Sequence, residues 1–245
     1  MAEFARYARQ LVLREVGVNG QQLLRDSSAL IVGLGGLGSI AAQYLAGAGL
    51  GRLLLADRDR VERSNLQRQT LYRQSDVGRP KTEAAAAQLA ALNPEVEYQT
   101  CDTDTWPAAV AQVDVVLDCT DNFPARYAIN RACVAARKPL VSGAAIRFEG
   151  QFAVFDLRRG GPCYRCLYAE VGPAAETCEE AGILGPVVGT VGALQALAAI
   201  KLLLGLGDDA GRLHTWDALR LQWRSHKITA DPQCPVCTTQ GAPSR

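Results

Sequence analysis

A glycine-rich segment, VGLGGLGS, occupies residues 32–39 and limits the possible folds of this chain more than any other stretch. It follows an apolar strand pattern, ALIV, and precedes a helical pattern, IAAQYLAGAG. Gly33, Gly35 and Gly38 have the GxGxxG spacing of dinucleotide-binding loops, in which glycines allow the backbone to approach a phosphate closely. Asp57 closes the next strand pattern, RLLLAD, where it can accept hydrogen bonds from ribose hydroxyls. The pattern predicts a nucleotide site that is compatible with NAD, FAD, S-adenosylmethionine or ATP.

Strand and helix patterns alternate through the first 145 residues. The expected strands are SALIVGL, RLLLAD, EVEYQT, DVVLDC and PLVSGA, and the expected helices cover 40–48, 81–92 and 125–136. This order is typical of an α/β fold with a Rossmann-like, mainly parallel sheet flanked by helices. Beyond Gly143, the segments FEGQFAVFDL, GRLHTWDAL and RLQWRSHKI alternate like antiparallel strands around a long apolar helix near 186–204.

These patterns predict one domain over 1–245. We expect an N-terminal helical arm over about 1–27, with two short helices broken at GVNG (17–20), a nucleotide-binding half over about 28–145, and a second half over about 146–240. Ligands of such sheets lie at the carboxyl ends of the strands. Four segments are expected there, namely the glycine loop, Asp57, CTDN at 119–122 and SGAA at 142–145.

Composition excludes several classes of partner. The formal net charge is +1 and no long run of like charge occurs, which argues against nucleic acid and an acidic membrane surface. The N-terminus has no apolar signal core, and the most apolar helix contains Lys201. We therefore expect a cytoplasmic protein that contacts neither nucleic acid nor membrane.

Four of the eight cysteines form two CxxC pairs, Cys163 with Cys166 and Cys234 with Cys237. Two such pairs supply four thiolates, the closed tetrahedral ligand set of a structural zinc site. The alternative is two unrelated or redox-active pairs. The sequence predicts a Zn²⁺ site that ties the C-terminal tail to the middle of the chain.

Polar residues after Asp57 favour ATP over a redox cofactor. Asn65, Gln67 and Arg68 follow within a few residues, and Lys81 begins a helical pattern. Displacement at a triphosphate needs several preplaced cations and donors, because negative charge develops on the reacting phosphate. The alternative for Arg68 and Lys81 is a solvated surface charge.

Asp121 ends the strand pattern VVLDCTD, with Asn122 beside it. A carboxylate at this edge can bind Mg²⁺ near phosphates. It can equally cap the helix that follows. The residues alone leave both interpretations open.

Several motifs occur in the order found in one enzyme family. They are RYARQ at 6–10, GLGGLGS, DxDxVxxSNLQRQ at 57–69, GRPK, DCTDN, the two CxxC pairs and TCEEAGILGPVVG at 177–189. From Arg6 to Cys237 the chain resembles the MoeB/ThiF family, whose members resemble the adenylating half of ubiquitin-activating E1 enzymes. The SNLQRQ motif and the cysteine spacing are far more specific than GxGxxG.

The resemblance implies a homodimeric adenylyltransferase. It would use ATP and Mg²⁺ to activate the C-terminal glycine of a small ubiquitin-like sulfur carrier ending in Gly-Gly, releasing pyrophosphate. It assigns Gly36 to the nucleotide loop, Asp57 to the ribose, Ser64, Asn65, Leu66, Gln67, Arg68 and Lys81 to the phosphates, and Asp121 with Asn122 to metal and nucleotide. The resemblance also implies that Arg9 reaches into the active site of the partner subunit. The family's 177–189 segment crosses the active site, so Cys178 could contact the activated carboxyl or have no required role.

Two other function classes compete with this one. A non-catalytic, zinc-tied nucleotide-binding scaffold would bind ATP without turnover, and an NAD(P)-dependent oxidoreductase would bind pyridine nucleotides. The motifs do not decide between a molybdopterin-synthase and a thiazole-pathway carrier, because VSGAAIRFEGQ resembles the first branch and LRLQWRS followed by CPVC the second. The sequence continues for only eight residues after Cys237, so we expect no rhodanese-like domain and a separate protein as the source of sulfur.

Overall fold

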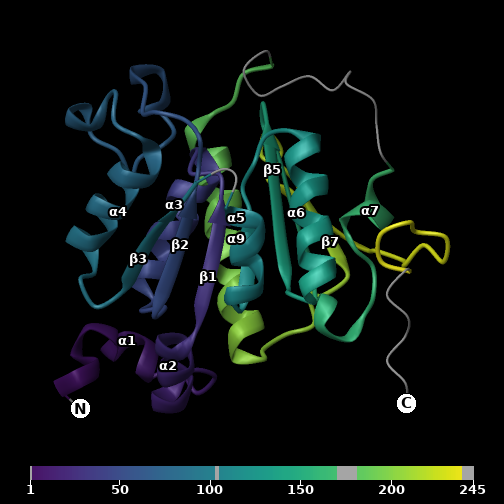
Figure 1. Cartoon of the computed structure of the whole chain (residues 1–245), viewed down its shortest axis with the longest axis horizontal. Coiled ribbons are helices and arrows are strands. Elements are labelled where there is room, and N and C mark those ends of the chain that lie inside the picture. Colours follow the sequence, from purple (N-terminus) through teal and green to yellow (C-terminus); the bar gives the residue numbers. More distant parts are fainter. Residues whose placement is uncertain (1, 103–104, 170–180, 239–245) are drawn as a thin grey trace.

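A computed structural model of the chain describes residues 2–102, 105–169 and 181–238. Its strands form one sheet in the order β3-β2-β1-β4-β5-β6-β7-β8 (Figure 1). Pairing is parallel from β3 to β5 and antiparallel from β5 to β8. The bounds are β1 Ser28–Val32, β2 Arg52–Ala56, β3 Glu97–Cys101, β4 Val115–Asp118, β5 Leu140–Ile146, β6 Glu149–Phe155, β7 Arg212–Asp217 and β8 Gln222–Lys227.

Helices connect the parallel strands and cover both faces of the sheet. They are α1 Ala8–Leu11, α2 Gly17–Asp26, α3 Gly36–Gly47, α4 Lys81–Leu92, α5 Trp106–Ala109, α6 Phe123–Ala136, α7 Tyr164–Leu167 and α9 Gly185–Leu204. Short 3₁₀ turns are η1 Ala2–Tyr7, η2 Arg63–Asn65, η3 Gln74–Asp76, η4 Val110–Gln112 and η5 Leu157–Arg159. The predicted Rossmann-like fold with an antiparallel C-terminal region is confirmed.

The sheet separates two apolar cores. Every residue of β1 is buried, and because side chains alternate along a strand, Ile31 packs with α3, α4 and α9 whereas Leu30 packs with α6. A strand buried on both faces must be apolar at successive positions, as ALIV is. The apolar content of this segment therefore follows from its central place in the sheet.

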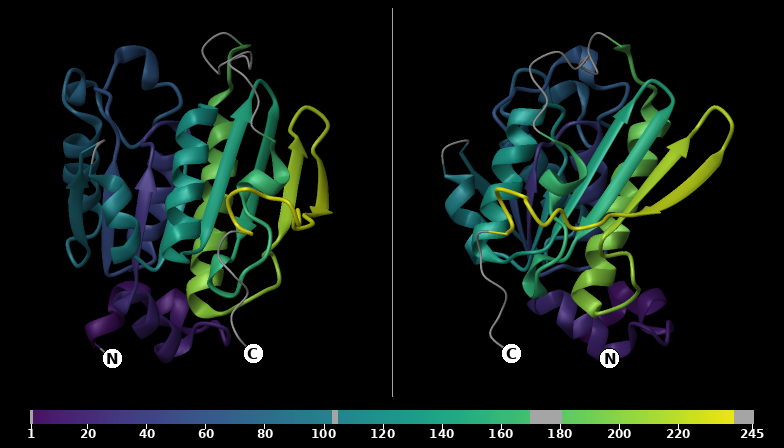
Figure 2. Two further views of the ribbon diagram at one scale, coloured as in Figure 1. Left: turned by 45° about the vertical axis from the view of Figure 1, so that its right-hand side comes forward. Right: turned by 90° about the vertical axis from the view of Figure 1, so that its right-hand side faces the viewer.

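Helix α9 is the central helix of one core. It is long and apolar enough to span a membrane by length and composition, yet it packs against α3 and along β5 and β6. Gly192 allows the close approach, because a Cβ there would overlap the carbonyl oxygen of Leu37. Burial against the sheet explains its apolar sequence. The β7–β8 hairpin projects from the end of the sheet away from β3 (Figure 2).

Two local predictions are wrong. The GVNG segment does not break the N-terminal arm, since α2 begins at Gly17 and the chain turns at residues 12–16 instead. The SGAA segment does not follow the fifth strand, since β5 continues through Ile146 as it pairs antiparallel with β6. That pairing, which the local pattern did not predict, keeps SGAA inside the β5–β6 ladder. The segment still lies at the carboxyl end of β4, because Ser142 is paired with Asp118, the last residue of β4.

Candidate functional site

The strand order has a topological switch point between β1 and β4. The chain leaves β1 toward β2 and leaves β4 toward β5, so the loops after these adjacent parallel strands diverge in opposite directions. Ligands of open α/β sheets bind at such a point, outside the carboxyl ends of the strands. The glycine loop follows β1 and residues 119–122 follow β4. The topology thus brings two of the predicted segments together.

Gly33 lies where these two loops touch. Its φ is +92°, and a Cβ there would lie 2.7 Å from the carbonyl oxygen of Cys119 and 3.2 Å from the nitrogen of Thr120. Gly38 is equally restricted, because a Cβ would overlap the carbonyl oxygen of Gly33. Helix α3 begins at Gly36, after an N-cap at Gly35, so its free amides lie at the end of β1. The loop therefore places the start of a helix, where free backbone amides favour anions, at the end of β1.

Asp57 is attached to the glycine loop by a hydrogen bond. Its Oδ2 accepts from the Leu34 amide at 2.6 Å, and its Oδ1 accepts from the Asp59 amide at 2.8 Å. Burial raises the pKa of Asp57, and the charge of Lys81 and these two amides oppose that rise. Each carboxylate oxygen keeps a further lone pair for a ligand hydroxyl.

Lys81 is not a solvated surface charge. Its side chain is 7% exposed, and Nζ lies 3.0 Å from Oδ2 of Asp59, whose side chain is 58% exposed. The first turn of α4 therefore holds a buried ammonium group beside Asp57 and Asp59. An ammonium desolvated at a strand end is suited to a phosphate, because its field is poorly screened there.

The SNLQRQ segment folds as a compact turn. Asn65 is buried and its Oδ1 accepts from the Glu62 amide at 3.2 Å, while Ser64 donates to the Glu62 carboxylate at 3.1 Å. Leu66 packs against the core. Gln67 is exposed, and Arg68 is half-buried with Nη1 donating to the carbonyl of Ser64 at 3.1 Å. The turn leaves Gln67 and Arg68 in contact with solvent at this edge.

The start of α9 lies against both the glycine loop and this turn. A Cβ on Gly36 would be 2.7 Å from Val188, and a Cβ on Gly185 would be 2.8 Å from the carbonyl oxygen of Gln67. These contacts bring the second half of the chain to the nucleotide-binding half. The described part of the 177–189 segment thus borders the candidate site.

The structure separates the two interpretations of Asp121. The cap of α6 is Asn122, whose Oδ1 accepts from the Ala125 amide at 3.0 Å. Asp121 is exposed, and its Oδ1 accepts from Nδ2 of Asn122 at 3.2 Å. Since the capping role belongs to its neighbour, the Asp121 carboxylate is available to a cation.

Arg9 does not join this site in the described chain. Helix α1, which carries the exposed Arg9, lies with α2 at the edge where the parallel strands begin (Figure 1). Tyr7 anchors it there through Glu95, with a 3.0 Å hydrogen bond just before β3. Cys178 lies outside the described residues.

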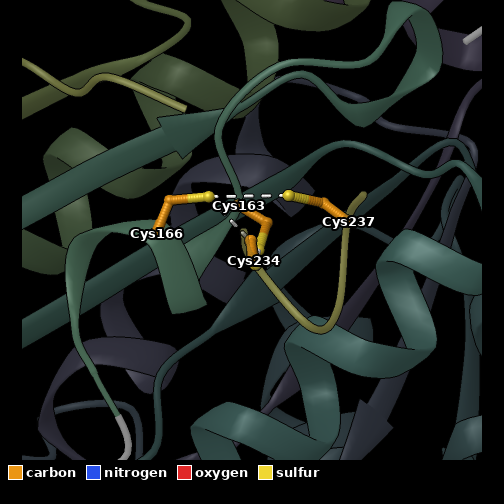
Figure 3. A group of neighbouring side chains, drawn as sticks. All are labelled: Cys163, Cys166, Cys234 and Cys237. Atoms are coloured by element: carbon orange, nitrogen blue, oxygen red, sulfur yellow. Dashed lines mark hydrogen bonds between the residues drawn. The ribbon is translucent and has the colours of Figure 1, made fainter. Parts of the chain in front are cut away.

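The four predicted metal ligands converge (Figure 3). Their sulfur atoms all lie within 4.8 Å of one another, with 3.7 Å between Cys163 and Cys234 and 3.5 Å between Cys166 and Cys237. Thiolates 2.3 Å from a tetrahedral zinc are about 3.8 Å apart, so the cluster fits zinc and is too open for disulfides. Asn130 of α6 donates to the Cys163 sulfur at 3.5 Å. Hydrogen bonds of this kind orient metal ligands.

Three residues at the site were missed by the sequence analysis. Asp59 pairs with Lys81, and its only local signal is the alternation of two acids in DRD. The Tyr72 hydroxyl donates to the Leu34 carbonyl at 2.9 Å and so supports the glycine loop. No local sequence pattern indicated this contact. Gln69 is 3% exposed, and its Oε1 has no hydrogen-bond partner among the described residues. Its position at the end of SNLQRQ was the available clue.

Known proteins resemble this chain along nearly its whole length. Molybdopterin-synthase adenylyltransferase from Escherichia coli K12 is 49% identical over 240 residues, 96% of each chain. Sulfur carrier protein ThiS adenylyltransferase from the same strain is 47% identical over 239 residues, covering 96% of this chain and 95% of that one. Adenylyltransferase and sulfurtransferase MOCS3 from Drosophila virilis is 48% identical over 97% of this chain and 54% of its own length.

Solved structures share the fold. The crystal structure of Escherichia coli MccB with succinimide matches with a TM-score of 0.83 at 23% identity, over 96% of this chain and 74% of that one. The MccB structure with ATP matches with a TM-score of 0.79 at 23% identity, over 95% and 74%. The ThiF family model matches residues 7–236. Together with the nucleotide loop, the SNLQRQ turn and the paired cysteines, this match means that the chain belongs to the ThiF family.

Proposed function

We propose that this protein is an ATP-dependent adenylyltransferase that activates the C-terminal glycine of a small ubiquitin-like sulfur carrier. The observation that carries the proposal is that four groups lie together at the carboxyl edge of the parallel strands. They are the glycine loop, Asp57, Lys81 and the loop of residues 119–122, which contains Asp121. That arrangement occurs in a chain 49% identical to a molybdopterin-synthase adenylyltransferase. The 47% identity to a ThiS adenylyltransferase supports the same reaction but leaves the carrier, molybdopterin-synthase subunit or thiazole-pathway protein, to experiment.

The chemistry requires no general base. A glycine carboxylate oxygen attacks the α-phosphorus of ATP, and a new P–O bond forms as the bond from that phosphorus to the bridging oxygen breaks. The electron pair leaves with pyrophosphate, and the product is an acyl-adenylate. The carboxyl is already ionised at neutral pH, so catalysis consists of aligning two anions and screening their charge. A site rich in donors and cations is suited to this task.

The chain's own residues take distinct roles in this proposal. The amides of Gly33–Gly38 bind phosphate, Asp57 accepts from the ribose, and Lys81 and Arg68 stabilise charge that develops on the phosphates. Ser64, Asn65, Leu66 and Gln67 form the turn that presents Arg68, and Asn122 orients Asp121. The 7% exposure of the Lys81 side chain supports its role, because water screens the field of a buried ammonium only weakly.

Two metals complete the proposal. Asp121 would hold Mg²⁺, which supplies positive charge at the phosphates when bound. Cys163, Cys166, Cys234 and Cys237 would hold a structural Zn²⁺, as their separations support. Burial raises the pKa of Cys163 to about 11, a cost that a bound cation would offset.

The assembly and its surroundings belong to the same proposal. Arg9 would enter the active site of the partner subunit in a homodimer, which is consistent with its distance from its own strand ends. Residues of about 28–145 would bind nucleotide and those of about 146–240 would receive the carrier, while Cys178 would meet the activated carboxyl. A separate protein would donate sulfur, and reduced thiols at a zinc site are suited to the cytoplasm.

ATP–pyrophosphate exchange tests the function directly. The purified protein would be assayed with each Gly-Gly-ending carrier of its source organism in turn, alongside Arg68→Ala and Asp121→Ala. We expect one carrier to stimulate exchange and both variants to lose it. ATP binding without exchange by any carrier would favour the scaffold function, and NAD(P) binding in place of ATP would favour the oxidoreductase.

A further inference from the structure

The exposed Asp121 stands on a backbone that is held at several points. The buried carboxylate of Asp118 accepts from both the amide and the hydroxyl of Thr120, at 3.1 and 2.7 Å. Ser142 of β5 donates to the other oxygen of Asp118 at 2.7 Å. Together with the Asn122 cap, these bonds fix the chain on either side of Asp121. A carboxylate on a fixed backbone binds a cation with less loss of entropy than one on a mobile loop.

Arg126 of α6 donates a further hydrogen bond to the backbone of the Thr120–Asn122 loop. It is only 9% exposed, and its Nη2 donates to the carbonyl of Thr120 at 2.8 Å. The guanidinium also lies over the ring of Phe123, 5.8 Å from the ring centre. A charged donor buried under a loop carbonyl is costly unless its contacts are specific. The Thr120 carbonyl immediately precedes Asp121, so Arg126 sets the direction of that peptide.

The same helix reaches the cysteine cluster one turn later. Asn130 lies four residues after Arg126, and its Oδ1 accepts from the Tyr164 amide at 2.9 Å. Tyr164 follows Cys163 directly and lines a small cavity together with Arg126. Helix α6 therefore packs its polar face between the cysteine cluster and the Asp121 loop.

We propose that Arg126 is a positioning residue that holds the Thr120–Asn122 loop so that Asp121 can bind the nucleotide's Mg²⁺. The inference rests on the proposed function, because it takes Asp121 as the metal-binding group. For the loss of the Arg126 charge, this role predicts a change in Mg²⁺ affinity opposite in sign to the change expected from charge repulsion alone. Removing a positive charge near Asp121 would tighten cation binding by Coulomb's law, whereas removing a positioning bond weakens it.

The test compares Arg126→Met and Arg126→Lys with Arg131→Met, an exposed arginine on the same helix. ATP affinity is measured calorimetrically without Mg²⁺ and over a Mg²⁺ series, and amide hydrogen exchange is followed across residues 118–124. We expect Arg126→Met to raise the Mg²⁺ concentration for half-maximal binding about tenfold, the effect of losing one charged hydrogen bond. Binding without Mg²⁺ should change by less than about twofold, and the loop amides should exchange faster. Arg131→Met should match the wild type.

An unchanged or lowered Mg²⁺ midpoint in a folded Arg126→Met protein overturns the proposal. Should that variant fail to fold, Arg126→Lys decides by the same measurement, since it keeps the charge but loses the planar donor. These binding assays need no carrier. Failure of the wild type to exchange pyrophosphate would therefore overturn the proposed function alone, whereas Mg²⁺-independent ATP binding in the wild type would overturn this inference.

Discussion

Replacing Gly33 by alanine should disrupt the nucleotide loop at one identifiable contact. An alanine methyl would lie 2.7 Å from the carbonyl oxygen of Cys119 and 2.9 Å from its carbon, where non-bonded carbon atoms pack at about 3.5–4.0 Å. Both obstacles are backbone atoms of the adjacent loop and cannot rotate away. The φ of +92° adds a conformational cost of about 1–2 kcal/mol for a residue with a Cβ.

The overlap adds a further penalty of about 1–3 kcal/mol, as for other overpacked sites. We therefore expect Gly33→Ala to lower the free energy of unfolding by about 2–5 kcal/mol, a large part of the 5–15 kcal/mol typical of a domain. If the loops part to relieve the overlap, the amides leave their positions, and ATP affinity should fall at least about tenfold.

Urea unfolding and calorimetric ATP binding measure the two effects separately. The matched control is Gly47→Ala, at the end of α3, where an added Cβ meets nothing within 4 Å. That change should leave ATP binding intact and be neutral or stabilising by up to about 1 kcal/mol. A Gly33→Ala protein with unfolding energy within about 0.5 kcal/mol of the wild type and normal ATP affinity would refute the reasoning.

Three further predictions concern charge, metal and pH. Lys81→Met should reduce pyrophosphate exchange at least about a hundredfold, the usual effect of losing one transition-state donor; undiminished exchange would exclude a role for this ammonium. Chelation should release one zinc per chain and lower the melting temperature, since zinc at a thousand times its Kd stabilises by about 4 kcal/mol; a Cys234→Ser protein with full zinc content and an unchanged melting temperature would contradict the site. Because the pKa of Asp57 is raised in the folded state, its stabilising effect is present below its ordinary value of 3.8 and is lost as the pH rises through the raised value. In urea unfolding at a series of pH values, the free energy of unfolding of the wild type, relative to that of Asp57→Asn, should fall as the pH rises from 3.8 through the raised pKa. A relative free energy that rises with pH over this range would contradict burial as the cause of the raised pKa.

Local patterns predicted the elements well where periodicity is strong. The helix over 81–92 has the predicted bounds, and the long helix over 185–204 begins one residue earlier than its pattern. Both carry their signal in consecutive residues, with proline at 80 and 186 marking where helix can begin. The family, too, was predicted from motifs that are short and contiguous, and the comparisons confirm it.

Errors and omissions arose where partners are distant in sequence. SGAA could not be assigned to the interior of β5 because its partner, β6, sets the length of the ladder. Asp59 and Lys81 are 22 residues apart, and nothing near either one indicates that they meet. Tyr72 and the Leu34 carbonyl, 38 residues apart, pose the same difficulty.

The sequence by itself determined the layered α/β architecture, the position of the glycine loop and the identity of the four cysteines that cluster, because periodicity, glycine spacing and CxxC pairs are local properties of the chain. Only the tertiary structure decided that Asn122, not Asp121, caps α6, and that Lys81 is buried against Asp59. It alone brought Arg126 beneath the Thr120 carbonyl. The physical reason is that burial, packing and charge pairing depend on which strands become neighbours, and the order β2-β1-β4-β5 joins segments that no short stretch of sequence contains.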